Sequence, residues 1–334
     1  MDKAIAFVCG GIGDQLYHFT QMQALAGLTA GKQIDIACLH APIMRRITAH
    51  CDWAGRITDI TPARHLSHIP AFLKFTRTLS AQRYNHAFIF HRSTSFKLAA
   101  LFSGIPHRTG LADGVADRLM LSRPLALNEG GERRAVWGHR PFIAAIDAYL
   151  CDHLQNDDWL KDVPIQANDE MQAEQQARYG HLPRPWVVVN LFAQDERRRW
   201  DIQHAAQTLA RLHAQHGGSF FINAGPDAVS WHQQLLALDR NYASFMHLTA
   251  DSYMDVGLDI ALYQMADMYL GVDSFTANLA LNCDLPCVTL FAKQTDQLRY
   301  RSVCYPVYPP ISKRFCDLPI SVICAEVDRL LSTA

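Results

Sequence analysis

The sequence has no hydrophobic run that approaches the roughly 18 uninterrupted apolar residues that a membrane-spanning helix needs. It also has no Cys-x-x-Cys pair, and its nine cysteines are an odd, scattered set that favours reduced thiols over a disulfide framework. Residues 1–10 are apolar for only a few positions before the glycines, which indicates a first β-strand rather than a secretion signal. These absences predict a soluble cytoplasmic protein.

Two cofactor signatures are missing as well. Asp157 and Asp158 are adjacent, so they do not form the Asp-x-Asp pair of a metal-dependent transferase, and the cysteine spacings fit no closed metal site. The glycines that follow the first strand lack the third glycine of a dinucleotide fingerprint, and Asp14 would repel a pyrophosphate there. We therefore expect neither a metal nor a cofactor, and a nicotinamide-dependent oxidoreductase is disfavoured.

The chain is long enough for two domains of ordinary size. Its net charge of −1 hides an asymmetry, because residues 1–150 hold 17 Lys and Arg against 10 Asp and Glu, and the remainder holds 14 against 22. A basic half suits an anionic partner, but cations interleaved with apolar residues, such as Arg45, Lys74 and Lys97, fit a solvated surface equally well. We expect no nucleic-acid partner.

Short β-rich runs alternate with helical patterns along the chain. The first half predicts strands at 4–8, 34–39 and 87–90, with helices at 15–29 and after Pro42. The second half predicts strands at 186–191, 219–223, 268–272 and 286–291, with helices at 204–216, 230–238, 254–265 and 276–282. Such alternation predicts parallel sheets with crossover helices, in two α/β domains that we place at 1–160 and 161–334. Ligands of such domains bind where strand ends and helix starts converge, which predicts a site in a cleft between them.

The first candidate site is the glycine turn that ends in Asp14 and opens a helix. Local physics leaves Asp14 either as a helix N-cap or as a functional carboxylate. Arg92, which follows the strand at 87–90, is either a contact for acceptor anions or an ordinary surface residue.

Two further candidates lie in the second half. The segment 271–280 ends a buried strand at Asp273 and Ser274 and begins a helix, whose free N–H groups suit a diphosphate unless Ser274 is simply a cap. Three adjacent arginines, Arg197, Arg198 and Arg199, follow the strand at 186–191. They could neutralise a departing phosphate, or they could form a solvated basic loop.

These motifs occur in an order that resembles glycosyltransferase family 9, the ADP-heptose:lipopolysaccharide heptosyltransferases. The segments that carry the resemblance are Gly-x-Gly-Asp at 11–14, Gly-Ile-x-x-Arg-x-Gly at 104–110, Arg-Arg-Trp at 198–200, Asp-Ser-x-x-x-x-Leu-Ala at 273–280 and the strand at 285–291. The family implies a GT-B fold, in which two Rossmann-like domains with parallel sheets face a central cleft. The N-terminal domain would bind the acceptor and the C-terminal domain the nucleotide sugar.

The resemblance also implies an activity. It is the inverting, metal-independent transfer of a heptose or a related sugar from an ADP-sugar to an anionic glycolipid, the lipopolysaccharide or lipooligosaccharide core. The reaction would take place at the cytoplasmic face of the inner membrane, with peripheral membrane contact.

The family's residue roles carry over to matching positions of this sequence. Asp14 matches the general base, and Arg198 stands where the family usually has a lysine, so the two are the implied catalytic residues. The donor-binding residues are then Gln194, Asp227, Met254, Asp273, Ser274, Phe275, Thr276 and Asn278, and we assign acceptor binding to Gly11, Gly13 and Arg92.

Two positions depart from the family's pattern. Phe275 replaces a glycine that lets phosphate approach the backbone, and Asn278 replaces a histidine. Two alternatives therefore stand beside the leading hypothesis: a heptosyltransferase of the same fold that acts on a protein, and a nucleotide-sugar-binding protein without catalysis.

Overall fold

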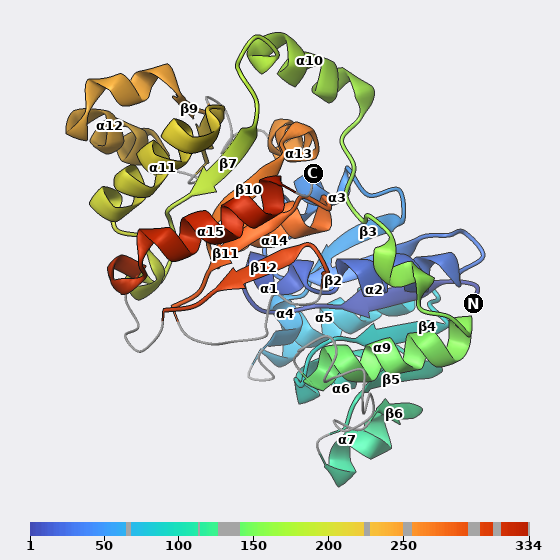
Figure 1. Cartoon of the computed structure of the whole chain (residues 1–334). Helices are drawn as coiled ribbons and strands as arrows, with labels where there is room; N and C mark the ends of the chain where they lie inside the picture. Colours follow the sequence, from blue (N-terminus) through green and yellow to red (C-terminus); the bar gives the residue numbers. More distant parts are fainter. Residues whose placement is uncertain are drawn as a thin grey trace. The chain divides into compact units, whose positions relative to one another are not determined.

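The computed structural model describes residues 1–64, 68–112, 114–125, 141–223, 228–249, 256–292, 301–309 and 315–332. It divides into two compact units, Met1–Pro164 and Ile165–Ala334, whereas the sequence predicts a division after residue 160. Each unit is a parallel β-sheet covered by helices (Figure 1). No helix of the described ranges is both long and apolar enough to span a bilayer.

The first unit contains a six-stranded parallel sheet in the order β3-β2-β1-β4-β5-β6. Its strands are β1 (Ala4–Phe7), β2 (Ile34–Cys38), β3 (Ala54–Asp59), β4 (His86–Ile89), β5 (His107–Leu111) and β6 (Arg123–Leu125). Its helices are α1 (Ile12–Leu16), α2 (Phe19–Gly27), α3 (Ala41–Thr48), α4 (Thr61–Arg64), α5 (Ile69–Ser80), α6 (Thr94–Phe102), α7 (Val115–Met120), α9 (Pro141–Leu154) and the 3₁₀ helix η1 (Asp158–Lys161).

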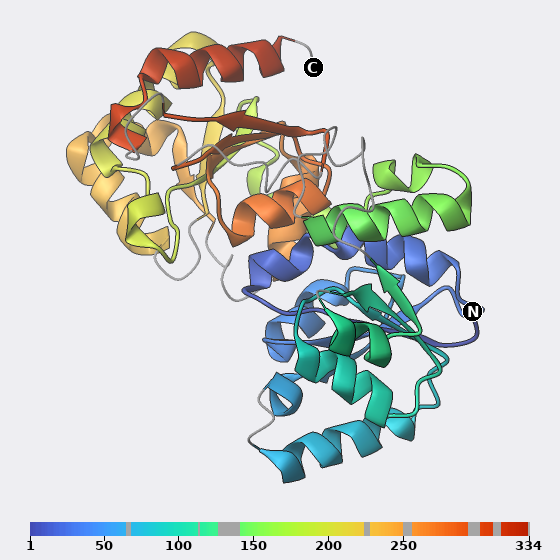
Figure 2. The ribbon, with the colours of Figure 1, turned by 90° about the horizontal axis from the view of Figure 1, so that it is seen from below.

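Helices cover both faces of this sheet, as parallel sheets require. Ile5 and Phe7 of β1 belong to a core that includes Phe72 of α5 and Phe96 of α6. On the opposite face, the ring of Phe88 contacts the ring of Tyr149 from α9, at a centroid distance of 5.9 Å. Figure 2 shows α2 and α9 on one side of the sheet and α5 on the other. Successive side chains of a strand point to opposite faces, so the strands of this sheet pack against two helical layers.

The single helix expected at 15–29 is wrong, because the chain forms α1 and α2 with a break at Tyr17 and His18. His18 is buried, and its ring lies 4.7 Å from that of Phe90 at the end of β4. Both helices bury apolar side chains in the interior of the first unit, so the hydrophobic pattern continues across the break. A pattern read only from that periodicity does not detect it.

The second unit repeats the architecture, with strand order β12-β11-β10-β7-β8-β9. Its strands are β7 (Trp186–Asn190), β8 (Ser219–Ile222), β9 (Met246–Leu248), β10 (Met268–Val272), β11 (Cys287–Leu290) and β12 (Cys304–Val307). Its helices are α10 (Asp169–Tyr179), α11 (Ile202–His216), α12 (Ala228–Leu238), α13 (Val256–Met265), α14 (Phe275–Asn282) and α15 (Ile320–Leu331), with 3₁₀ helices η2 (Glu196–Arg198), η4 (Arg240–Ser244) and η5 (Phe315–Asp317).

The two sheets have the same connectivity. Each unit begins in the middle of its sheet, adds two strands on one side, and then crosses back to add three strands on the other side. This is the Rossmann order, in which the direction of strand addition reverses between the first and the fourth strand. The reversal lies between β1 and β4 in the first unit and between β7 and β10 in the second. Ligands of such sheets bind beyond the carboxyl ends of these strand pairs.

Candidate functional site

The glycine turn with Asp14 follows β1, at the reversal point of the first sheet. Gly10 has φ +111°, and a Cβ there would lie 2.8 Å from the Cβ of Asp14, so only glycine fits. The backbone N–H of Gly11 donates to Oδ2 of Asp14 at 3.1 Å. Gly11 is the N-cap of α1 and Asp14 is the third residue of the helix, so the interpretation of Asp14 as the N-cap is wrong. The carboxylate of Asp14 is half-buried and folds back over the turn.

The loop after β4 lies at the same reversal point. Nδ1 of His91 accepts a hydrogen bond from the backbone N–H of Ser93 at 3.0 Å. Burial and the Lys97 ammonium lower the pKa of His91, and the Asp14 carboxylate acts in the opposite direction. β1 and β4 are neighbouring parallel strands, so the loops that follow them lie side by side, and we call these two loops the first half-site.

A buried ion pair supports this loop. Nζ of Lys97 donates to the carbonyl oxygen of Arg92 at 3.3 Å and lies 2.6 Å from Oδ2 of Asp117. The side chain of Lys97 is 0% exposed, so neither alternative that the sequence left open for it, a contact with an anionic partner or a solvated surface cation, applies. The side chain of Arg92 is exposed, as an acceptor contact would have to be. The local sequence carries no signal for the burial of Lys97, because Asp117 is 20 residues away.

The second half-site lies at the reversal point between β7 and β10. Asn190 ends β7, is 1% exposed, and its Nδ2 amide donates to Ser274 Oγ at 2.7 Å, to Thr276 Oγ1 at 2.7 Å and to the Phe192 carbonyl at 3.0 Å. Its Oδ1 accepts from the N–H of Phe192 at 3.0 Å. The hydroxyl of Tyr269 lies 3.2 Å from Thr276 Oγ1. We call Asn190, Tyr269, Ser274 and Thr276 the hydroxyl cluster.

The missing side chain of Gly271 makes room for this cluster. A Cβ at Gly271 would lie 2.4 Å from the carbonyl oxygen of Asn190 and 2.8 Å from the hydroxyl of Tyr269. Ser274 occupies the N-cap position of α14, but its side chain does not cap the helix and instead joins the hydroxyl cluster. The interpretation of Ser274 as a plain cap is therefore wrong. Asn190 and Tyr269 were not singled out by the sequence, although Asn190 stands at the end of an apolar strand, where a buried amide is unusual.

Arg198 reaches this half-site from the loop after β7. Its Nη1 lies 3.2 Å from both the carbonyl oxygen and Oδ2 of Asp273. The two neighbouring arginines pair elsewhere: Arg197 with Asp195 at 2.8 Å, and Arg199 with Glu196 at 3.3 Å. The side chain of Arg197 is 88% exposed, whereas that of Arg198 is 39% exposed. Of the three, Arg198 is the one that contacts Asp273.

The remaining donor candidates have different environments. Phe275 is half-buried. It is the first residue of α14 and therefore has a helical conformation. Asn278 is 2% exposed, and its amide donates to the carbonyl oxygen of Ser274 at 3.0 Å, within the first turn of α14. Gln194 is exposed on the loop that carries Arg198. Asp227 and Met254 lie outside the described residues.

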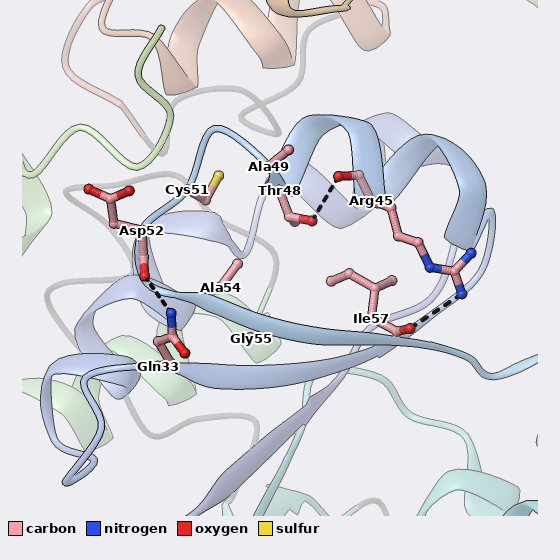
Figure 3. Close-up of a pocket in the computed structure, with 9 residues that line it drawn as sticks. All are labelled: Gln33, Arg45, Thr48, Ala49, Cys51, Asp52, Ala54, Gly55 and Ile57. Atoms are coloured by element: carbon pink, nitrogen blue, oxygen red, sulfur yellow. Dashed lines mark hydrogen bonds between the residues drawn. The ribbon is translucent and has the colours of Figure 1, made fainter. Parts of the chain in front are cut away.

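A cavity of about 610 Å³ lies in the first unit, between α3 and the edge strand β3 (Figure 3). Nη2 of Arg45 reaches the carbonyl oxygen of Ile57 across it, at 3.4 Å, and Gln33 lies at its other end. β2 separates this edge from β1, and no predicted site residue lines the cavity. We therefore do not assign it to the candidate site.

The second unit buries the thiols of Cys283, Cys287, Cys304 and Cys324. Burial raises the pKa of Cys283 and Cys287 far above the usual range, which disfavours the thiolate that metal binding or nucleophilic attack requires. Within the described ranges, no three His, Cys, Asp or Glu side chains gather as a metal site.

Comparison with known proteins identifies the family. The model of glycosyltransferase family 9 (heptosyltransferase) matches residues 72–314, which is well over half of the chain. The chain belongs to glycosyltransferase family 9. The match spans β4, the loop with Arg92 and the whole second half-site, and it confirms both the predicted family and the prediction that the protein is a glycosyltransferase.

Solved structures of the family share the fold of this member. The ADP-heptose lipopolysaccharide heptosyltransferase II of E. coli has a TM-score of 0.73 and 18% identity, over 99% of both chains. A family 9 glycosyltransferase from Veillonella parvula has a TM-score of 0.75 at 11% identity, over 100% of this chain and 98% of that one. E. coli heptosyltransferase WaaC with ADP-2-deoxy-2-fluoro heptose has a TM-score of 0.70 at 13% identity, over 98% of this chain and 99% of that one. A search of curated proteins gave no significant match. The matches confirm the predicted α/β fold class, GT-B with two Rossmann-like parallel sheets.

Proposed function

We propose that this family 9 enzyme transfers a heptose, or a related sugar, from an ADP-sugar to a lipopolysaccharide or lipooligosaccharide core acceptor, with inversion at the anomeric carbon. The second unit binds the donor, and the first unit binds the anionic glycolipid acceptor. The reaction needs neither a metal nor a cofactor, and it takes place on the cytoplasmic face of the inner membrane. The WaaC structure with an ADP-heptose analogue supports the choice of donor.

The observation that carries this proposal is the arrangement of Arg198, Asp273 and the hydroxyl cluster at the start of α14. Both contacts of Arg198 with Asp273 use Nη1, whereas a guanidinium has five N–H donors in a planar fork. The remaining donors suit a diphosphate, and the N–H groups of the first turn of α14 add the positive end of the helix dipole. Ser274 Oγ and Thr276 Oγ1 are already oriented by Asn190.

The proposed chemistry balances without a metal. Asp14 takes the proton of an acceptor hydroxyl, and the hydroxyl oxygen forms a bond to the anomeric carbon of the donor sugar. The bond from that carbon to the diphosphate oxygen breaks on the opposite face, and its electron pair leaves with ADP. Arg198 and the start of α14 stabilise the negative charge that grows on the leaving diphosphate. Attack opposite the leaving group inverts the anomeric centre.

The first half-site provides the proposed base and acceptor contacts. The N–H of Gly11 donates to Oδ2 of Asp14, which orients the carboxylate at the start of α1. The exposed guanidinium of Arg92 suits an anionic group of the acceptor. Gly11 and Gly13 allow the acceptor to approach the backbone of the turn.

The decisive experiment incubates the protein with ADP-heptose and candidate acceptors and measures ADP release. Release with a lipopolysaccharide core acceptor, and an inverted anomeric configuration of the product by NMR, would support the proposal. Release only with a protein acceptor would favour the protein-directed alternative. Donor binding without turnover on any acceptor would favour a non-catalytic protein, for which Phe275 and the buried Asn278 are the motivating departures.

A further inference from the structure

A long segment of the first unit has charge of only one sign. Residues 60–112 contain no aspartate or glutamate, and they contain seven lysines and arginines: Arg64, Lys74, Arg77, Arg83, Arg92, Lys97 and Arg108. The described part of this segment forms α4, α5, β4, α6 and β5. Lys97 is neutralised by Asp117 of α7, while Lys74 and Arg77 of α5 are exposed.

Large apolar side chains are exposed on the same elements. Ile69 and Leu73 are 62% and 42% exposed, and they lie one helical turn apart on the outer face of α5. Phe102, the last residue of α6, is 63% exposed, and its ring contacts the ring of Phe72 edge-on, at a centroid distance of 6.2 Å. Phe72 lies one helical turn from Ile69 on α5, so Phe102 borders the exposed face that carries Ile69 and Leu73. We call Ile69, Leu73, Lys74, Arg77 and Phe102 the α5 surface.

Lys74 and Arg77 have no carboxylate partner within α5. Cations on a solvated helix are often paired with carboxylates three or four residues away, but α5 contains no carboxylate. A second copy of the same surface would meet it with like charge, which opposes self-association. Cations beside exposed apolar side chains on one helix face are the combination that suits an anionic lipid surface, because the apolar groups enter the boundary layer while the cations meet the headgroups.

We propose that the α5 surface docks this protein onto an anionic lipid bilayer. Ile69, Leu73 and Phe102 insert at the level of the headgroups, and Lys74 and Arg77 contact lipid phosphates. The inference deepens the proposed function and rests on it for its purpose, since a lipid-linked acceptor meets the enzyme at a bilayer.

The test is co-sedimentation of the full-length protein with vesicles that contain no acceptor. One set contains phosphatidylglycerol with phosphatidylcholine, and the other contains phosphatidylcholine alone. We expect binding to the anionic vesicles to be at least about tenfold stronger and to weaken with added salt. The Lys74→Gln/Arg77→Gln variant should bind about 25-fold more weakly, because each cation near an anionic surface contributes roughly fivefold. The Ile69→Ser/Leu73→Ser/Phe102→Ser variant should bind at least about tenfold more weakly.

Matched variants of the second unit are the controls. Val229, Leu238 and Val322 have exposed fractions of 51%, 46% and 46%, and their triple serine variant should bind like the unchanged protein. Arg211→Gln/Arg240→Gln, at two exposed cations, is the charge control. Equal binding to both vesicle types, or equal losses in the α5 and control variants, would overturn the inference. So would capture of an acidic protein by the α5 surface without vesicle binding.

Failure of this inference is distinguishable from failure of the proposed function. ADP release with a delipidated, water-soluble core oligosaccharide tests transfer without any bilayer. Both α5 variants should retain that activity, which also shows that they fold. Vesicle binding without ADP release would leave the docking surface in place and refute the transferase proposal instead.

Discussion

Asn190 is the residue on which the hydroxyl cluster depends, and replacing it by alanine tests the donor half-site. Its amide donates to both Ser274 Oγ and Thr276 Oγ1 from a position that is 1% exposed. An alanine at 190 removes that donor and leaves the two hydroxyls held by each other and by Tyr269 alone within the hydroxyl cluster. If these hydroxyls and the start of α14 hold a diphosphate, ADP binding must weaken, although Asn190 itself does not contact the ligand.

The magnitude follows from the contacts. The two amide hydrogens and Oδ1 of Asn190 can form about three good hydrogen bonds, each worth about 1 kcal/mol net, so Asn190→Ala should destabilise the second unit by about 2–4 kcal/mol. Loss of one well-aligned hydrogen bond to a charged diphosphate costs about 1.5–3 kcal/mol, which corresponds to a loss of ADP affinity of at least about tenfold. Asn190→Asp has nearly the same shape and can accept from both hydroxyls, but it buries a charge and sets a carboxylate oxygen against the Phe192 carbonyl, so it should also be destabilised. Its negative charge beside the diphosphate should weaken ADP binding by at least as much as Asn190→Ala does.

Calorimetric titration with ADP measures the affinity, and chemical denaturation followed by Trp fluorescence measures the stability. Asn223→Ala is the matched control, because the amide of Asn223 is also buried and donates to Asp259 at 3.0 Å. It should lose stability with little loss of ADP affinity. Normal ADP affinity in both Asn190 variants would refute the donor assignment, and unchanged stability of Asn190→Ala would refute the hydrogen bonds on which the reasoning rests.

Four further outcomes are expected. Asp14→Asn should lower turnover by about 10²–10⁴ at nearly unchanged ADP affinity, and near-normal turnover would remove Asp14 from the mechanism. Arg198→Ala should weaken ADP binding and slow transfer. Arg197→Ala, at a side chain that is 88% exposed, should do neither. Equal effects of the two substitutions in steady-state kinetics would argue against a special role of Arg198. Phe275→Gly should change ADP affinity by less than about threefold, because Phe275 begins α14 in a helical conformation, and a large gain in affinity by calorimetry would mean that the ring occupies the phosphate position. Because the pKa of His91 is lowered in the folded protein, the imidazole of the unfolded chain is protonated first as the pH falls. The stability that neutral His91 contributes is therefore present above a pH of about 6.5 and is lost on acidification. His91→Gln should flatten this part of the curve of unfolding free energy against pH, and identical curves for the two proteins would contradict the lowered pKa.

The sequence by itself determined the fold class and the family. Alternating strand and helix patterns predicted two parallel α/β units, and all strands expected at 4–8, 34–39, 87–90, 186–191, 219–223, 268–272 and 286–291 have counterparts in the sheets. The order of the glycine, arginine and Asp-Ser motifs predicted glycosyltransferase family 9, and the family model confirms it. These features are local, since a strand, a helix start or a glycine turn is encoded by a few adjacent residues.

Only the tertiary structure decided which side chains meet. It placed Lys97 in a buried ion pair with Asp117, separated Arg198 from its exposed neighbour Arg197, and joined Asn190 to Ser274 across 84 residues of sequence. It also divided one expected helix at His18, whose ring packs on Phe90. Burial and hydrogen-bond partners depend on the order in which parallel strands assemble, because crossover connections bring distant segments to the same edge of a sheet. That order is set by the packing of the whole unit, and no short stretch of the sequence contains it.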